Sequence, residues 1–386
     1  MKKTIFFLII IIPCILSGCW DSVETEKLGV VTLLGIESSG NNDIKVTVQE
    51  ASGKNQSSSN QYSAGSDSRS FNTYSEVSNS ITNAIQKISS NQHKDIYFGH
   101  TKVIILDEKL VTSKGIQFVI EFYEKIPEMR LRTWILISKS NQLDKILNSS
   151  MNLDIDTGSA IEETIRNEND NSYLTVNNLK DFIEMLNTPG SQAYTSGIAV
   201  SPKTSGSKTS NDMFVIKDTA VFKSDKLIGW MKNEESRGLS FASGNVRGGF
   251  MDIPFGDNAV SLKIVKTKLK ISPLIINEKM QINLNLDIVS NISGSRVKCD
   301  FMNTDTIEKL QQIQSEKAKR EITLAISRSK DLNSDVFQFG NYFNMEYPTY
   351  WKKIKNNWNF YYPNVQVNIN VNSAIRNIGS TYRTLK

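Results

Sequence analysis

The sequence predicts a multi-domain protein of the α+β class, whose two halves differ in their apolar patterns. Residues 19–200 alternate short strand patterns with amphipathic helix patterns, which predicts an N-terminal α/β domain with a mixed sheet. Residues 213–386 combine strands of alternating apolar and polar residues with one long helix pattern, which predicts a C-terminal domain of largely antiparallel strands plus a long helix. A chain of 386 residues is long enough for two or three domains.

The chain begins with a segment typical of an exported precursor. A short cationic start at residues 1–3 is followed by an almost unbroken apolar run from Ile5 to Leu16. A run of about a dozen apolar residues is typical of a signal peptide, whereas a membrane-spanning helix needs roughly 20. We therefore expect residues 1–18 to be removed as a lipoprotein signal peptide.

The end of this segment, Leu16-Ser17-Gly18-Cys19, has the pattern of a bacterial lipobox. In such a motif, cleavage follows Gly18 and the thiol of Cys19 carries a diacylglyceryl group. Two or more acyl chains anchor a protein stably, because each buried methylene contributes about 0.8 kcal/mol. The motif therefore predicts a mature chain that begins at Cys19 and is tethered to a membrane by lipid. The alternative is an ordinary secretory signal followed by a coincidental cysteine.

Cysteine content and charge limit the remaining chemistry. Cys14 would leave with the signal peptide and Cys19 is assigned to lipid, so Cys299 has no partner for an intramolecular disulfide. We expect Cys299 to pack as a small apolar side chain. The formal net charge of +5 is dispersed along the chain, without the basic block typical of nucleic-acid binding, so no nucleic-acid partner is predicted.

In the first half, strand and helix patterns alternate. Residues 28–36 read as a buried strand, and residues 45–49 alternate as a half-buried strand. Residues 53–70 are rich in serine and asparagine and predict a mobile loop. A helix is predicted over residues 77–88, where apolar residues recur at helical spacing. The other predicted elements are strands at 102–106 and 131–137 and helices around 116–123, 143–147, 161–165 and 176–186.

Residues 201–212 are the predicted linker between the two domains, because they contain no large apolar residue and many residues that break regular structure. Beyond them, residues 282–288 alternate cleanly between apolar and polar, which predicts a strand with one buried and one solvated face. A long helix is predicted from Asp305, where Asp305 and Glu308 could form a capping box. Further strands are predicted at 214–222, 227–231, 265–271 and 365–371, and a shorter helix at 347–358.

The sequence offers no metal site. His93 and His100 are the only histidines, and neither has a usable cysteine nearby, whereas a zinc site needs three or four clustered ligands. Asp154 and Asp156 superficially resemble the start of a calcium loop, but the further acidic ligands and the closing glutamate are missing. We therefore predict no metal and no cofactor, and expect the histidines to be structural.

Catalytic residues are not predicted either. Glu234 and Glu235 are adjacent, and neighbouring residues of a strand face opposite sides, so they are not expected to act as an acid–base pair. Residues 244–249 are glycine-rich but lack the Lys-Ser/Thr of a phosphate-binding loop. Trp351 and Trp358 are expected to pack in the core.

Several of these segments together resemble the lipoprotein C subunits of bacterial spore nutrient-germinant receptors, the Ger(x)C family. The resemblance extends over essentially the whole mature chain, although Glu37 stands where family members typically have aspartate. It is carried by residues 18–21, 28–36, 96–106, 227–249 and 335–340 and by the spacing of Trp351 and Trp358 before the last predicted strand.

The resemblance implies a non-catalytic protein needed for receptor assembly or signalling during spore germination. It implies a location on the outer face of the inner spore membrane, through lipid on Cys19, in complex with the integral-membrane A and B subunits. Residues 19–200 and 213–386 would then be the N- and C-terminal germination-receptor domains. One alternative is a lipid-anchored solute-binding protein of a transporter, which normally has two doubly wound parallel lobes. Another is a tethered wall-active enzyme.

Overall fold

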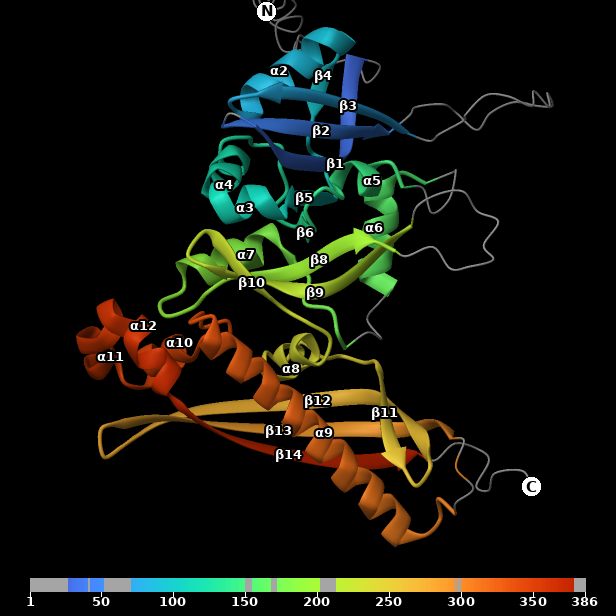
Figure 1. Ribbon diagram of the computed structural model, residues 1–386, viewed down its shortest axis with the longest axis vertical. Coiled ribbons are helices and arrows are strands. Elements are labelled where there is room, and N and C mark those ends of the chain that lie inside the picture. The colour runs from blue at the N-terminus through green and yellow to red at the C-terminus, as the bar shows by residue number, and fades with distance from the viewer. Residues whose placement is uncertain are drawn as a thin grey trace, which may run out of the picture.

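The computed structural model describes residues 27–40, 42–51, 71–149, 155–167, 172–201, 213–295, 297 and 300–377. Within them, two β-sheets follow one another along the long axis of the molecule, and helices pack on and between them (Figure 1). The predicted α+β class is confirmed, because the first sheet mixes parallel and antiparallel pairs and the second is built on a long antiparallel hairpin. Across the described residues, none of the helices combines the length and apolar character needed to cross a membrane.

The first sheet has the strand order β10-β9-β8-β6-β5-β1-β2-β3, with β4 beside β1 and β7 beside β6. The central strands β1, β5, β6 and β8 are parallel to one another, and the flanking strands are antiparallel. Their bounds are β1 (Leu28–Ser39), β2 (Asp43–Ala51), β3 (Phe71–Ser78), β4 (Asp95–Tyr97), β5 (Val103–Asp107), β6 (Trp134–Ser138), β7 (Asn177–Asn178), β8 (Tyr194–Val200), β9 (Phe214–Lys223) and β10 (Lys226–Met231).

Helices cover both faces of this sheet, which explains the continuous apolar runs of its central strands. In β1, Leu33 packs with one core and its neighbour Leu34 with the other, and both side chains are fully buried. The helices are α2 (Ile81–Gln92), α3 (Glu108–Ser113), α4 (Gln117–Glu124), α5 (Leu143–Leu147), α6 (Thr157–Asn167) and α7 (Leu179–Asn187). Val77, predicted as part of the first helix, ends up in β3, because Ser80 caps α2 by accepting a hydrogen bond from the Asn83 N–H.

The second sheet has the order β11-β12-β13-β14, with β11 (Phe250–Phe255), β12 (Asn258–Ile276), β13 (Lys279–Ser295) and β14 (Gln366–Asn377). Strands β12 and β13 form a long hairpin across a two-residue turn in which Asn277 and Glu278 both have positive φ, as a type I′ turn requires. Strand β14 is parallel to β13. The alternation predicted for 282–288 is confirmed, since its apolar residues are all buried.

The predicted long helix is α9 (Thr304–Asp331), which crosses one face of the second sheet (Figure 1). The capping box predicted at Asp305 is wrong, because Asn303 is the N-cap and its side chain accepts from the N–H groups of Asp305 and Thr306. The helix predicted at 347–358 is broken into short pieces. The remaining helices are α8 (Glu234–Ala242), α10 (Phe339–Glu346), α11 (Pro348–Ile354) and α12 (Trp358–Tyr361), with 3₁₀ turns η3 (Lys355–Asn357) and η4 (Tyr362–Asn364).

Strands β9 and β10 correct one prediction about sheet membership. Both follow the predicted linker and were counted among the strands of the C-terminal domain, but β9 pairs antiparallel with β8, with Val200 opposite Phe214. The two strands therefore form the edge of the first sheet. An alternating pattern shows that a strand is half-buried but not which strand it pairs with. Residues 202–212 lie outside the described residues, so the linker itself stays a prediction.

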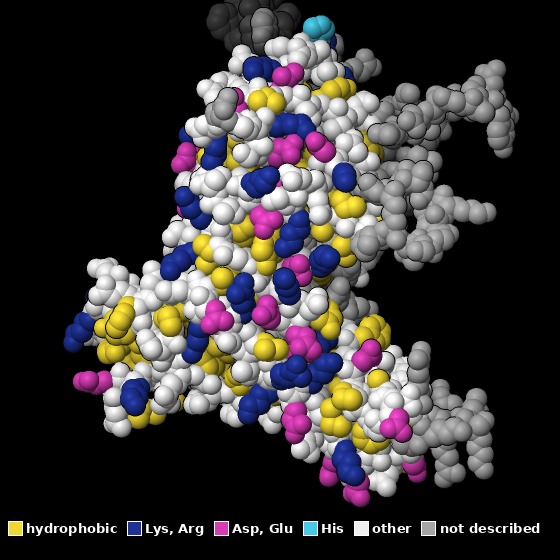
Figure 2. Space-filling view, in the orientation of Figure 1, with side chains coloured by type: hydrophobic (Ala, Val, Ile, Leu, Met, Phe, Trp, Pro, Cys, Tyr) yellow, Lys and Arg dark blue, Asp and Glu magenta, His cyan; other side chains and the backbone are white. Residues whose placement is uncertain are grey.

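The surface shown in Figure 2 carries basic and acidic side chains interspersed over both sheets, without a block of one sign. Apolar side chains gather on the lobe formed by α10, α11 and α12. Met345 and Phe360 of this region are 71% and 73% exposed.

Candidate functional site

The predicted anchor cannot be placed in the fold. Gly18 and Cys19 lie outside the described residues, as does Cys299. Lipid attachment to Cys19 and cleavage after Gly18 therefore stay predictions that depend on the sequence alone.

The two histidines occupy separate exposed turns. His93 ends α2 in the left-handed conformation, and its Nδ1 lies 2.8 Å from the carbonyl oxygen of Ser90. The ring of His100 lies 5.9 Å from the ring of Tyr97. In the part of the chain that the structure describes, no three histidine, cysteine or acidic side chains are grouped so that they could hold a metal ion.

The acidic residues considered for calcium binding or for catalysis have structural roles where the structure describes them. Asp156 accepts a hydrogen bond from the Ser159 N–H at 2.9 Å at the start of α6, while Asp154 lies outside the described residues. Glu234 and Glu235 are in the first turn of α8 and not on a strand, which corrects the prediction. Glu235 accepts from the backbone N–H of Lys232 at 2.8 Å, so this carboxylate ties the first turn of α8 to the residue before its N-cap.

The two tryptophans pack in the core, as predicted. The rings of Trp351 and Trp358 are 5.2 Å apart in a T-shaped arrangement, and both side chains are buried. The indole N–H of Trp358 donates to a carboxylate oxygen of Asp335 at 3.1 Å. These aromatic residues therefore hold together the lobe of α10 to α12.

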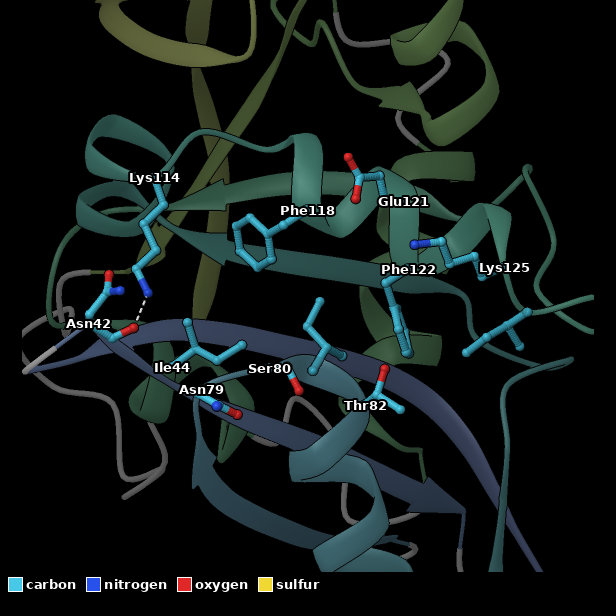
Figure 3. Close-up of a pocket in the computed structure, with 12 residues that line it drawn as sticks. Asn42, Ile44, Asn79, Ser80, Thr82, Lys114, Phe118, Glu121, Phe122 and Lys125 are labelled. Atoms are coloured by element: carbon cyan, nitrogen blue, oxygen red, sulfur yellow. Dashed lines mark hydrogen bonds between the residues drawn. The ribbon is translucent and has the colours of Figure 1, made fainter.

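A pocket of about 700 Å³ opens between α4 on one side and β2 and the start of α2 on the other (Figure 3). Its apolar wall comes from Phe118 and Phe122, one turn apart on α4, which point toward Ile44 of β2 and toward α2. Ile81 and Ile126 complete this wall. The volume lies in the range typical of small-molecule sites.

The rim of the pocket is polar and carries both signs of charge. Lys114 closes one end by donating a hydrogen bond to the carbonyl oxygen of Asn42, as the dashed line in Figure 3 shows. Glu121 and Lys125 line the pocket from the α4 side, and Asn79 and Thr82 line it from the start of α2 (Figure 3). Such a lining suits an amphipathic ligand or an apolar side chain of a partner.

The pocket does not contain an arrangement suited to nucleophilic catalysis among its described residues. Ser80, the serine of its lining, uses its hydroxyl oxygen to accept from the Asn83 N–H at 3.2 Å. A nucleophilic serine would instead need a base within hydrogen-bond reach.

Sequence reasoning missed this pocket. The helix around 116–123 was predicted from an apolar stripe that does not include Phe118 or Phe122, namely Ile116, Val119, Ile120 and Tyr123. Two phenylalanines four residues apart beside a core-facing stripe were a signal that the helix has a second apolar contact.

Comparison with known proteins gives matches over nearly the whole chain. The family model described as "Spore germination protein N-terminal domain" matches residues 21–200, and the model described as "Spore germination B3/ GerAC like, C-terminal" matches residues 217–379. Spore germination protein KC of Bacillus subtilis (strain 168) is 21% identical, and the alignment covers 100% of this chain and 98% of that protein. Spore germination protein B3 of the same organism is 21% identical, with 98% of each chain covered.

A solved structure has a similar fold. The crystal structure of the GerBC protein matches with a TM-score of 0.55 and 18% sequence identity, covering 89% of this chain and 96% of that chain. At this identity the likeness shows a shared fold alone. The two family models and the full-length relatives show more: this chain belongs to the Ger(x)C family of spore germinant-receptor subunits.

Proposed function

We propose that this chain is a lipid-anchored, non-catalytic subunit that a spore nutrient-germinant receptor needs for assembly or signalling. The observation that carries the proposal is the match of both germination-protein domain models, over residues 21–200 and 217–379, in a chain that also has a lipobox. Its partners would be the integral-membrane A and B subunits of the same receptor.

The proposed location is the outer face of the inner spore membrane, with lipid on Cys19 as the anchor. Such a tether confines the folded part of the chain to a thin layer beside the membrane. Confinement raises the effective concentration for neighbouring subunits, so that modest contacts suffice for assembly. A few buried anchor residues are then expected to dominate the contact with those subunits.

A role without catalysis is supported by the contacts of the candidate residues. His93 bonds to its own helix, Asp156 accepts from the first turn of α6, Glu235 bonds to the backbone before α8, and Ser80 is an N-cap. The alternative of a transporter-type solute-binding protein is less well supported, because the second sheet is a hairpin with two flanking strands and not a doubly wound lobe.

The test is a pair of strains, one lacking the protein and one carrying Cys19→Ala. We expect the deletion to abolish or slow germination through its own receptor, while germination through unrelated routes continues. Cys19→Ala should leave an unlipidated precursor and release or mislocalise the protein, whereas Cys299→Ala, the matched control, should leave lipidation and location unchanged. Normal germination of the deletion strain with every nutrient, or turnover of a wall or peptide substrate by the purified protein, would contradict the proposal.

A further inference from the structure

The outer edge of β14 has no partner strand among the described residues. Strand β14 pairs with β13 on one side and is the last strand of the second sheet among the described residues (Figure 1). An exposed strand edge presents a row of backbone N–H and C=O groups to which another strand can bind. A further strand can therefore pair with this edge.

Side chains of α9 bond to backbone groups at the two ends of this edge, and no described side chain bonds to the outward backbone groups between them. At one end, the side-chain oxygen of Gln311 accepts a hydrogen bond from the Ile375 N–H at 3.1 Å. At the other, the ammonium of Lys330 donates to the carbonyl oxygen of Val365, directly before β14, at 2.5 Å. Successive residues of a strand direct their backbone groups to opposite edges. The outward groups between these two ends therefore belong to Val367, Ile369, Val371 and Ser373.

A groove of about 550 Å³ runs between this edge and α9. We call it the β14 groove; Lys319, Thr323, Ile326, Ser327 and Lys330 of α9 line it together with residues 367–370 of β14. Its floor is apolar, since Ile326 and Ile369 are buried beneath it. Polar and cationic side chains form its α9 wall.

The charge of the β14 groove is positive and uncompensated within the described residues. Neither Lys319 nor Lys330 forms an ion pair with a described carboxylate. Burial lowers the pKa of Lys330, so this ammonium would be stabilised by a carboxylate placed beside it. The two lysines are 11 positions apart on α9, which is about 16 Å along a helix, a span that about five residues of extended chain cover.

We propose that the β14 groove binds an extended acidic segment of a partner protein, which adds to the second sheet as a strand beside β14. Backbone hydrogen bonds to the outward groups would supply affinity, and alternate carboxylates facing α9 would meet the two lysines. On the opposite face, the asparagine side chains of β14 already bond across to β13, for example Asn370 to Asn285 at 3.1 Å, so a further polar strand extends an existing ladder. This inference goes beyond the proposed function and does not depend on it.

Charge argues against two other occupants. A second copy pairing through the same edge would bring two lysine-lined grooves together, and like charges oppose such a contact. The C-terminal residues 378–386 contain Arg383 and Lys386 and no acidic residue, so they do not complement the groove. An acidic segment of another protein fits best.

The test uses the full-length protein in detergent and a capped seven-residue peptide in which glutamate alternates with threonine; the comparison peptide has lysine in place of glutamate. Backbone hydrogen exchange is followed with and without peptide. We expect the acidic peptide to slow exchange at Val367, Ile369 and Val371, and the lysine peptide to have no effect. Absence of protection at millimolar acidic peptide, equal protection by both peptides, or protection at another strand edge would overturn the proposal.

Two variants separate the backbone and charge contributions. Val371→Pro removes an outward N–H without touching the bonds to β13 and should weaken peptide binding about fivefold, whereas Val371→Ala keeps the donor and should bind normally. Lys319→Glu should weaken binding about threefold, whereas Lys309→Glu, on the exposed first turns of α9, should not. Unchanged binding in both Val371→Pro and Lys319→Glu would overturn the proposal even if the peptide protects the strand.

Discussion

Arg237 and Glu321 form a bidentate ion pair that is almost completely removed from solvent and joins α8 to α9. The Nε of Arg237 lies 2.6 Å from one carboxylate oxygen of Glu321, and a terminal guanidinium nitrogen bonds to the other oxygen. The side chains are 1% and 0% exposed. Burial by itself lowers the pKa of Arg237, but the hydrogen bonds and charge of Glu321 outweigh it and raise the pKa above its usual range.

The ion pair connects two helices that are associated with different sheets. Helix α8 follows directly on β10, the edge of the first sheet, whereas α9 covers the second sheet. The guanidinium also lies 4.3 Å from the ring centre of Tyr173, in a cation–π contact. Arg237 and Glu321 are therefore placed to fix the position of the first sheet relative to the second.

Replacing one partner should be strongly destabilising. Glu321→Leu leaves the guanidinium of Arg237 buried without a counter-charge, and we expect the free energy of unfolding to fall by about 3–5 kcal/mol. The double variant Arg237→Met/Glu321→Leu replaces both charges by apolar groups and should regain most of that loss. Urea unfolding of the three proteins measures the difference, and a loss below about 1 kcal/mol in Glu321→Leu would contradict a structural role for the pair.

Gly238 permits the close approach of α8 and α9 that brings this pair together. A Cβ at this position would lie 2.0 Å from the carbonyl oxygen of Glu321, which is a backbone atom and cannot rotate away. In a helix interior, alanine is normally more stabilising than glycine by about 1 kcal/mol. A clash of this kind, however, costs about 1–3 kcal/mol or more. We therefore expect Gly238→Ala to destabilise the protein.

The matched control is Gly294→Ala, because a Cβ there meets no heavy atom within 4 Å and the backbone needs no positive φ. Its effect on the unfolding free energy should stay within about 0.5 kcal/mol. Thermal unfolding of both variants decides the point. Equal stability of the two proteins would show that α8 and α9 can move apart without loss.

Asp335 should make stability depend on pH. Its carboxylate is buried and accepts hydrogen bonds from the N–H groups of Phe339 and Gly340 and from the indole of Trp358. Burial outweighs these bonds and raises the pKa of Asp335 from 3.8 to about 7. The unfolded chain thus releases this proton near pH 3.8, and the folded protein holds it until about pH 7.

The sign follows from which state binds the proton. The contribution of Asp335 to the free energy of unfolding is fully present below pH 3.8. It is lost as the pH rises through about 7, because the folded state then has to bury a charged carboxylate. Between pH 5.5 and pH 8 the loss is about 2 kcal/mol, at 1.36 kcal/mol per pH unit. Urea unfolding at the two pH values measures it. Asp335→Asn should remove this dependence, and a slope unchanged in that variant would assign it to other groups.

Much of the fold could be predicted, because buried strands and helices differ in the period of their apolar residues. The strand at 282–288 and the long helix α9 were recognisable from periodicity alone. The predicted helix starts were less accurate, because the N-caps of α2 and α9, Ser80 and Asn303, were not recognised in the sequence. The sheet to which β9 and β10 belong was not predicted, although β8 and β9 are consecutive strands, because the residues at 201–212 between them have the composition of a linker.

The sites were less predictable than the fold. The pocket under Phe118 and the β14 groove each form where two elements meet, and only the tertiary structure brings these elements together. The ion pair is a further example, because Arg237 and Glu321 are 84 positions apart and nothing in the sequence links them. Cys19 is the exception: its motif is contiguous, so the sequence alone suffices to predict it.

The pairing of β9 with β8 predicts where the chain can be divided. A fragment of residues 213–386 keeps β9 and β10 but loses the strand to which β9 is bonded, so it exposes an unpaired edge and should aggregate or show poorly dispersed amide signals. A fragment of residues 232–386 begins after β10 and keeps α8, α9 and the whole second sheet, and it should be the better-behaved of the two. Amide spectra of both fragments at equal concentration measure this. A well-dispersed 213–386 fragment with protected β9 amides would show that these strands fold without β8, and would favour a boundary at 201–212 over one after β10.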